Sequence, residues 1–169
     1  MTTRLIAVSD AAELAALLTA NLEHLQPYEP DRPADYVTVD GQRRMIEEVL
    51  VRYREGGALP HVIVEDDRIV GRATLSTIVR GPFQSASLGY WVDHRVGGRG
   101  VATDAVGQIV RLAFGELGLH RVEASTLVDN ARSQRVLVKN GFQRYGLAPR
   151  YLKIAGDWRD HVLFQRLDE

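Results

Sequence analysis

The spacing of apolar residues changes from that of a strand to that of a helix within one segment, 87–114. Leu88, Tyr90 and Val92 lie at every second position, which predicts a strand, and apolar residues from 101 to 113 recur at helical spacing. Between the two lies a glycine cluster: Gly97, Gly98 and Gly100. The first N–H groups of a helix lack intrahelical partners and carry partial positive charge, and glycine lets a phosphate approach the main chain. The segment therefore predicts an anion site.

The residues around the glycines leave the ligand open. Arg99 can add a cation and Thr103 a hydroxyl donor, but the Lys followed by Ser or Thr that defines a P-loop is absent. A dinucleotide fingerprint needs a third glycine near position 103 and an acidic residue about 20 residues on; Thr103 occupies the first place, and Glu123 sits early in its predicted strand. A tight turn without a ligand also explains the glycines.

Elsewhere the same periodicities predict a mixed α/β domain, with both halves of the chain packed on one sheet. Helices are predicted from the N-cap candidates Ser9 and Asp10 to Leu22, over 39–54, from 101 to about 113, and from 130 to 139. Strands are predicted over 5–8, 61–65, 69–79, 87–93 and 121–128, followed by a last hairpin within 142–167 that turns at 155–157. Residues 24–33 hold three prolines and predict a loop.

Composition narrows the class of protein. The 169 residues are 45% hydrophobic and 25% charged, which suits one domain spanning 1–169. A formal net charge of −1 argues against nonspecific nucleic-acid binding. With no cysteine there is no disulfide or cysteine zinc site, and the five histidines show no metal-ligand spacing. No apolar run approaches the length of a membrane span and the N-terminus lacks a signal core, so we expect a cytoplasmic protein.

Two motifs give the glycine cluster a specific interpretation. GRGVA at 98–102, after a strand ending YWVD, resembles the acetyl-CoA pyrophosphate loop of the GNAT superfamily of N-acetyltransferases, which reads Gln or Arg, any two, Gly, any, Gly or Ala. Gly100 and Ala102 fit that pattern, but Gly97 stands where Gln or Arg is usual, with Arg95 as a candidate substitute. DNARSQRVLVKNGF at 129–142 resembles the segment after the fifth strand of the same superfamily.

Three further stretches point to one branch of this superfamily. HLQPYEPDR at 24–32, STIVRGPFQSASLGYW at 76–91 and YLKIAGDWRDHVL at 151–163 are similar to the bacterial ribosomal-protein-alanine N-acetyltransferases, which modify protein N-termini. The resemblance implies acetyl-CoA as acetyl donor and a GNAT fold, a mostly antiparallel sheet of about seven strands with about four helices. It also implies that a bulge splays the strand ending at Asp93 away from the fifth strand. A homodimer is in keeping with the branch, although no stretch identifies an interface.

The resemblance assigns the cofactor contacts residue by residue. Main-chain groups of Trp91 and Val92 would bind the pantetheine amides, and Asn130 would contact the pantetheine arm near the thioester. Ser133 is the candidate proton donor to the departing thiolate, although a helix-surface serine is the plain alternative. The pyrophosphate would be held around the glycine turn, by Arg95, Gly97, Gly98, Arg99, Gly100, Val101, Ala102 and Thr103.

The general base and the acceptor groove rest on fewer signals. Glu123, on the strand beside the gap, is the leading candidate base, but it could equally pair with Arg121. A related branch places a glutamate near position 152, where this chain has Leu152, so a single-base mechanism does not transfer. The acceptor groove is expected to involve Tyr28, Glu29, Tyr90, Asp160 and His161, of which Glu29, Asp160 and His161 are further base candidates.

Each of these assignments has a structural alternative. Residues 24–33 could be an ordinary proline-stiffened loop, Asp160 could fix a turn, and His161 could be a buried structural histidine. The leading functional prediction is acetyl transfer to the α-amine of a protein N-terminus, with a ribosomal protein as the expected partner. The alternatives are a small-molecule amine acetyltransferase and a noncatalytic acyl-CoA-binding module.

Overall fold

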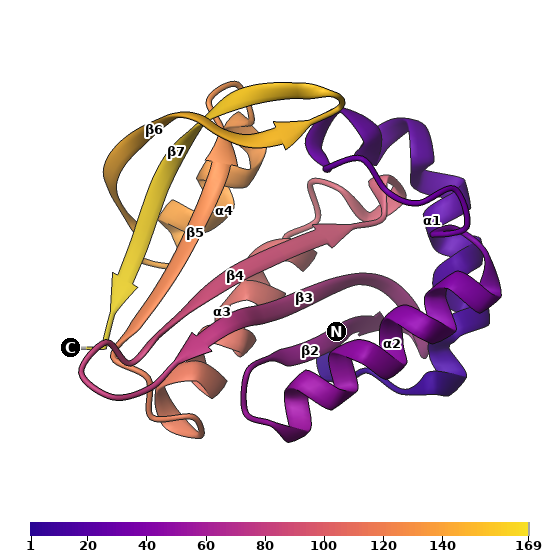
Figure 1. Cartoon of the computed structure of the whole chain (residues 1–169), viewed down its shortest axis with the longest axis horizontal. Coiled ribbons are helices and arrows are strands. Elements are labelled where there is room, and N and C mark those ends of the chain that lie inside the picture. The colour runs from indigo at the N-terminus through magenta and orange to yellow at the C-terminus, as the bar shows by residue number, and fades with distance from the viewer. Residues whose placement is uncertain (169) are drawn as a thin grey trace.

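The computed structural model describes residues 1–168, and its central feature is a sheet of seven strands in the order β1-β2-β3-β4-β5-β7-β6 (Figure 1). Within residues 1–168 only β4 and β5 pair in parallel, and every other pair is antiparallel. This confirms the predicted mostly antiparallel sheet. The strands are β1 (Thr2–Leu5), β2 (Leu59–Glu65), β3 (Arg68–Val79), β4 (Ser85–Val92), β5 (Arg121–Leu127), β6 (Gln143–Ile154) and β7 (Asp157–Leu167).

Helices cover both faces of this sheet. Figure 1 shows α3 and α4 behind β4 and β5, whereas α2 lies in front of β2 and β3 with α1 beside it. Two apolar cores result, one under α3 and α4 and one under α1 and α2. None of the helices in residues 1–168 is both long and apolar enough to cross a bilayer. They are α1 (Ala11–Leu25), α2 (Val39–Arg54), α3 (Val101–Gly115) and α4 (Ala131–Lys139), with 3-10 turns η1 (Val8–Asp10), η2 (Gln26–Tyr28) and η3 (His94–Val96).

The N-terminal boundaries differ from those predicted. The strand expected over 5–8 was wrong, because β1 ends at Leu5 and a 3-10 turn begins at Val8. The Asp10 carboxylate explains this turn: it accepts the Ala7 N–H at 2.8 Å and pairs with the Arg4 guanidinium at 2.8 Å, and it does not cap α1. Helix α1 also runs on to Leu25, and Pro27 fits in η2 because a proline near the start of a helix loses no hydrogen bond.

Strands β4 and β5 pair over only three residues and then separate. Ser85, Ala86 and Ser87 face Arg121, Val122 and Glu123. Beyond them, among the described residues, the rest of β4 pairs only with β3, and the rest of β5 only with β7. The two arrows diverge in Figure 1, as predicted. The bulge expected between β4 and β5 was wrong: these strands pair in register and then separate because each continues with a different partner. The irregularity lies on the other side of β4, where the β3–β4 register shifts between Ser76 and Val79.

Candidate active site

The glycine turn presents its amides to open space. Gly100 is the N-cap of α3 with φ 90°, and Gly98 has φ 80°; an added Cβ would meet nothing within 4 Å at either residue. The first amide of the helix that finds a backbone acceptor is that of Asp104, which donates to Gly100 at 3.0 Å. Within residues 1–168 the N–H groups from 98 to 103 have no backbone acceptor. Such a run of convergent amides at a helix N-terminus suits an anion.

Both arginines near the turn are already paired with carboxylates. Arg99 lies 3.2 Å from Glu65 of β2, and the Arg95 guanidinium binds both oxygens of Asp93, which is only 3% exposed. Burial alone would raise the pKa of Asp93, but the hydrogen bonds from Arg95 outweigh it and hold that pKa below its ordinary value. The main-chain amides, more than free cations, therefore give the turn its positive character.

Gly97 departs from the usual loop pattern for a steric reason. A Cβ at this position would lie 3.0 Å from the carbonyl oxygen of His94, which also accepts the Gly97 N–H at 3.1 Å. A longer side chain would crowd η3. Arg95, the candidate substitute, is directed to Asp93 instead.

The start of α4 places a hydroxyl pair beside the gap between β4 and β5. Asn130 caps α4, its side-chain oxygen accepting the Ser133 N–H at 3.1 Å. The Tyr90 hydroxyl, from β4, lies 2.7 Å from Ser133 Oγ and 3.1 Å from the Ser133 carbonyl oxygen. Burial raises the pKa of Tyr90 to about 12, so the phenol keeps its proton at neutral pH. The expected proton donor therefore has a second, buried hydroxyl as its partner.

Glu123 lies at the closed end of the gap, in the last β4–β5 pair. One of its carboxylate oxygens accepts from Arg121 Nε at 2.9 Å and from the Tyr145 hydroxyl at 3.0 Å. The pairing with Arg121 anticipated as an alternative is thus present. The Glu123 carboxylate is therefore already engaged by a guanidinium and a phenol.

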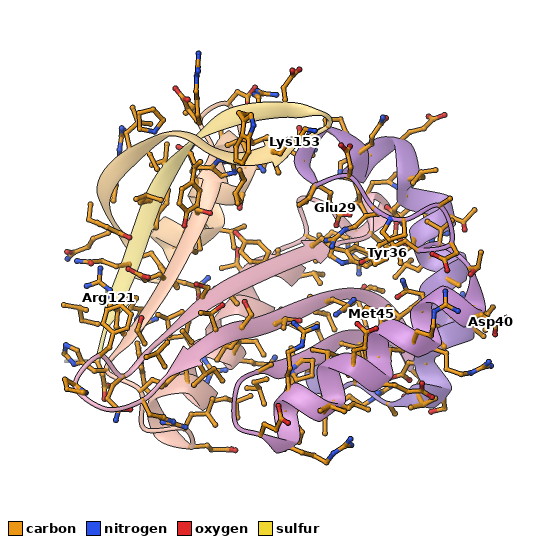
Figure 2. The ribbon with its side chains drawn as sticks, in the orientation of Figure 1. Glu29, Tyr36, Asp40, Met45, Arg121 and Lys153 are labelled. Atoms are coloured by element: carbon orange, nitrogen blue, oxygen red, sulfur yellow. The ribbon has the colours of Figure 1, made fainter. Side chains whose placement is uncertain are left out.

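The loop between α1 and α2 spans the open end of the gap. The Glu29 carbonyl oxygen accepts from the Ala155 N–H, at 3.3 Å, in the β6–β7 turn. Figure 2 shows Glu29 below the hairpin tip that carries Lys153, with Tyr36 and Met45 following toward α2. Burial raises the pKa of Glu29, although Arg32 and Arg72 oppose the shift. Tyr28, on η2, is exposed.

Asp160 and His161 both lie in the β6–β7 hairpin. The Asp160 carboxylate accepts the N–H of Arg150, at 2.8 Å, where the β6–β7 register shifts and Arg150 has φ 48°. His161 is 4% exposed, pairs in register with Leu127 of β5, and has Nδ1 3.1 Å from the Arg159 carbonyl oxygen. Both contacts correspond to the structural alternatives raised for these residues.

Comparison with known proteins decides the family. Residues 1–143 match the family described as "Acetyltransferase (GNAT) domain". The chain belongs to the GNAT acetyltransferases. It is 39% identical over 167 residues to a Bacillus subtilis (strain 168) protein named probable N-acetyltransferase YjcK, covering 98% of this chain and 92% of that protein. It is 32% identical over 162 residues to the Escherichia coli (strain K12) [ribosomal protein uS5]-alanine N-acetyltransferase, covering 95% and 84%.

Solved structures agree with this GNAT assignment. The Vibrio fischeri ribosomal-protein-S5-alanine acetyltransferase superimposes with a TM-score of 0.94 at 32% identity, covering 99% of this chain and 92% of that one. Mycobacterium smegmatis RimJ in complex with CoA-disulfide gives a TM-score of 0.95 at 34% identity, covering 98% and 80%. The chain is therefore an N-acetyltransferase that uses acetyl-CoA, related to ribosomal-protein acetyltransferases.

The residues of this GNAT enzyme fit that cofactor. Free amides at 98–103 suit a diphosphate, and the unpaired edge of β4 beyond Ser87 offers strand hydrogen bonds to an extended amide chain. Trp91 and Val92 lie on that edge.

The sequence patterns did not single out Arg72. Arg72 lies in the middle of β3, directly opposite Trp91 of β4, and its side chain is partly buried beside Met45 of α2. The available signal was a cation inside a predicted strand, directly after Ile69, Val70 and Gly71. An arginine at such a position needs a partner or a function.

Proposed function

We propose that this acetyltransferase acetylates the α-amine of a protein N-terminus by direct attack on the thioester, with a ribosomal protein as acceptor. The observation that carries the proposal is the gap between β4 and β5. The Tyr90–Ser133 hydroxyl pair lies on one face of this gap, and the loop that carries the Glu29 carboxylate lies on the other. Tyr90 packs with the core under α3, and Trp91 with the core under α1 and α2. Relatives named as ribosomal-protein-alanine acetyltransferases support the choice of acceptor.

On the cofactor side, the amides from Gly98 to Thr103 would hold the pyrophosphate and the main chain of Trp91 and Val92 the pantetheine. Bound acetyl-CoA supplies an electrophilic thioester carbonyl and a thiolate leaving group. Ser133 Oγ–H would donate a hydrogen bond to the sulfur as the C–S bond breaks and negative charge builds there, while the Tyr90 hydroxyl donates to Ser133 Oγ. Because the Tyr90 proton is firmly held, this second hydrogen bond persists throughout the neutral range. The amine proton would pass to the base, and the thiolate would take its proton from solvent.

On the acceptor side, we assign the base role to Glu29. An α-amine has an ordinary pKa near 8, so it needs only a modest base before its nitrogen can attack. Burial brings the pKa of the Glu29 carboxylate upward, toward that of the amine. Glu123, already bonded to Arg121 and Tyr145, remains the alternative, with Tyr28, Asp160 and His161 as expected neighbours of the groove.

The same proposal covers the organisation of the protein. We infer one domain over 1–169, since one sheet collects strands from both ends of the described chain. A ribosomal acceptor would place the enzyme in the cytoplasm. A homodimer remains a prediction that sedimentation can test.

Isotope-labelled acetyl-CoA with synthetic peptides tests the proposal. We expect transfer to peptides beginning with Ala or Ser, and none to the same peptides with a blocked N-terminus and a free lysine. Absence of turnover across small first residues, despite acetyl-CoA binding, would reject the N-terminal assignment. Turnover of free amines from a small-molecule panel in its place would identify the other candidate class of acceptor.

A further inference from the structure

Arg72 is poorly satisfied for an arginine in the centre of a sheet. Its Nε is fully buried and has no hydrogen-bond partner within residues 1–168. Its Nη1 lies 3.4 Å from the sulfur of Met45, and a thioether is a weak acceptor. A buried guanidinium normally has a carboxylate or several oxygens around it, because leaving it unpaired costs several kcal/mol.

The groups around Arg72 form a cluster with more cations than carboxylates, which we call the acceptor-face cluster: Glu29, Arg32, Tyr36 and Arg72. Arg32 Nε lies 3.7 Å from a Glu29 oxygen, and the Arg32 guanidinium lies 4.8 Å from the centre of the Tyr36 ring. Burial lowers the pKa of Arg72; Tyr36 and Glu29 counteract this, and Arg32 adds to it. Within the cluster, the Glu29 carboxylate thus attracts both Arg32 and Arg72, so the Arg72 guanidinium can still donate a hydrogen bond to another oxygen.

The cluster lies on the acceptor face, beside the gap. Arg72 is the cross-strand neighbour of Trp91, and in the part of the chain that the structure describes β4 pairs at that level with β3 alone. Figure 2 places Glu29, Tyr36 and Met45 in a row over this face, from the α1–α2 loop to α2. The Arg72 guanidinium therefore lies beside Met45 of α2 and within the electrostatic reach of Glu29, on the strand next to the one whose edge is assigned to the pantetheine.

We propose that Arg72 binds the carbonyl oxygen of the first residue of the acceptor, so that Arg72 and Glu29 together recognise an α-amino carbonyl group. The inference rests on the proposed function and names the part of the acceptor that the site reads. An incoming ammonium is repelled by Arg72 and Arg32 and attracted by Glu29, so the amine is directed to the carboxylate. The carbonyl, one carbon away, then faces the guanidinium, which has donors to spare.

Arg72→Met tests the proposal, with Arg68→Met at the exposed start of the same strand as the matched control. We expect kcat/KM for an Ala-initiated peptide to fall about 10- to 100-fold in Arg72→Met, mainly through KM, because a charge-assisted hydrogen bond is lost. The KM for acetyl-CoA should stay within twofold. Isopropylamine, which has the amine without the carbonyl, should act equally well as a substrate or inhibitor of Arg72→Met and of Arg68→Met. Arg72→Lys should recover part of the peptide activity.

Thermal unfolding separates this role from a structural one. Glu29 keeps Arg32 as its partner when Arg72 is replaced, so exchanging this incompletely hydrogen-bonded cation for an apolar side chain of similar length should leave the melting temperature unchanged or raise it. A lowered melting temperature with equal losses for peptide and isopropylamine would overturn the proposal, as would peptide kinetics within threefold of wild type. Free L-alanine separates a failure of the proposed N-terminal acetylation from a failure of the proposed role of Arg72. If the wild type acetylates alanine but no peptide, the N-terminal function fails, and the Arg72→Met kinetics are then compared with alanine, whose carboxylate would take the place of the carbonyl.

Discussion

Tyr90→Phe is the smallest change that tests the hydroxyl pair at the active site. It removes one oxygen, which lies 2.7 Å from Ser133 Oγ and 3.1 Å from the Ser133 carbonyl oxygen, and keeps the ring packed in the core under α3. Loss of one neutral hydrogen bond costs about 1 kcal/mol. In a domain of this size that lowers the melting temperature by about 2–4 °C, so the variant should fold.

The kinetic effect should be larger than the effect on stability. The Tyr90 phenol can donate to the Ser133 carbonyl or to Ser133 Oγ, and only the second arrangement leaves the serine proton directed toward the departing sulfur. Losing that orientation should cost about 1–2 kcal/mol in the transition state, a fall in kcat of about 5- to 30-fold. Ser133→Ala removes the donor itself and should cost about 100-fold. The KM values should change little, because the interaction strengthens only as charge builds on sulfur.

Initial rates of thiol release with an N-terminal peptide provide the assay, and Tyr53→Phe on the exposed side of α2 provides the control. If the two hydroxyls act as one unit, the Tyr90→Phe/Ser133→Ala double variant should be no slower than Ser133→Ala alone. Multiplicative losses in the double variant, or a wild-type kcat in Tyr90→Phe, would refute the coupling.

Three other perturbations test separate parts of the structure. Gly100→Ala should raise the acetyl-CoA KM at least about 10-fold, because its Cβ enters the space facing the amides. The control Gly118→Ala, at φ 59°, should incur only the backbone strain of about 1–2 kcal/mol. Equal KM values in the two variants would contradict this prediction. Glu29→Gln should lower kcat about 100-fold or more and remove the acidic limb of the pH profile, because activity falls once the Glu29 carboxylate is protonated. Glu123→Gln should keep that limb. The reverse result would make Glu123 the base. Burial lowers the pKa of His61 from 6.5 to about 4, so the unfolded chain takes up a proton first and about 2–3 kcal/mol of stability is lost as pH falls from 6.5 to 4. Denaturation of His61→Leu should show a smaller loss of stability over this range. An unchanged dependence of stability on pH would exclude His61 as its source.

The glycine turn could be predicted from the sequence because every signal for it is local. A period change from two to 3.6 locates the strand and the helix, and the glycines between them permit the left-handed values seen at Gly98 and Gly100. The helix over 39–54 has the predicted ends for the same reason: its cap, Thr38, and the glycines after it are adjacent in sequence.

Side-chain partners were less predictable because register brings them together. Ser133 was expected at the site, but its hydroxyl partner is Tyr90, which β4 places there only through its pairing with β3 and its packing on α3. The sequence suggested that Arg99 is a free cation, but in the fold Glu65, at the end of β2, lies beside Arg99 and pairs with it. Arg95 was different: Asp93, two residues earlier, was a local signal that its guanidinium could be engaged.

The alternation of β4 links the two halves of the proposed reaction. Because successive side chains of a strand point to opposite faces, Tyr90 must reach the α3 and α4 face if Trp91 packs under α1 and α2. Adjacent residues of β4 thus relate to the two groups on opposite faces of the sheet: Tyr90 belongs to the hydroxyl pair, and Trp91 lies opposite Arg72 of the acceptor-face cluster. A shift of β4 by one residue relative to β3 would turn Tyr90 to the other face, away from Ser133, and Trp91 would no longer lie opposite Arg72. The Ala73–Tyr90 and Arg72–Trp91 pairs are therefore as necessary to the proposed chemistry as the residues that carry it.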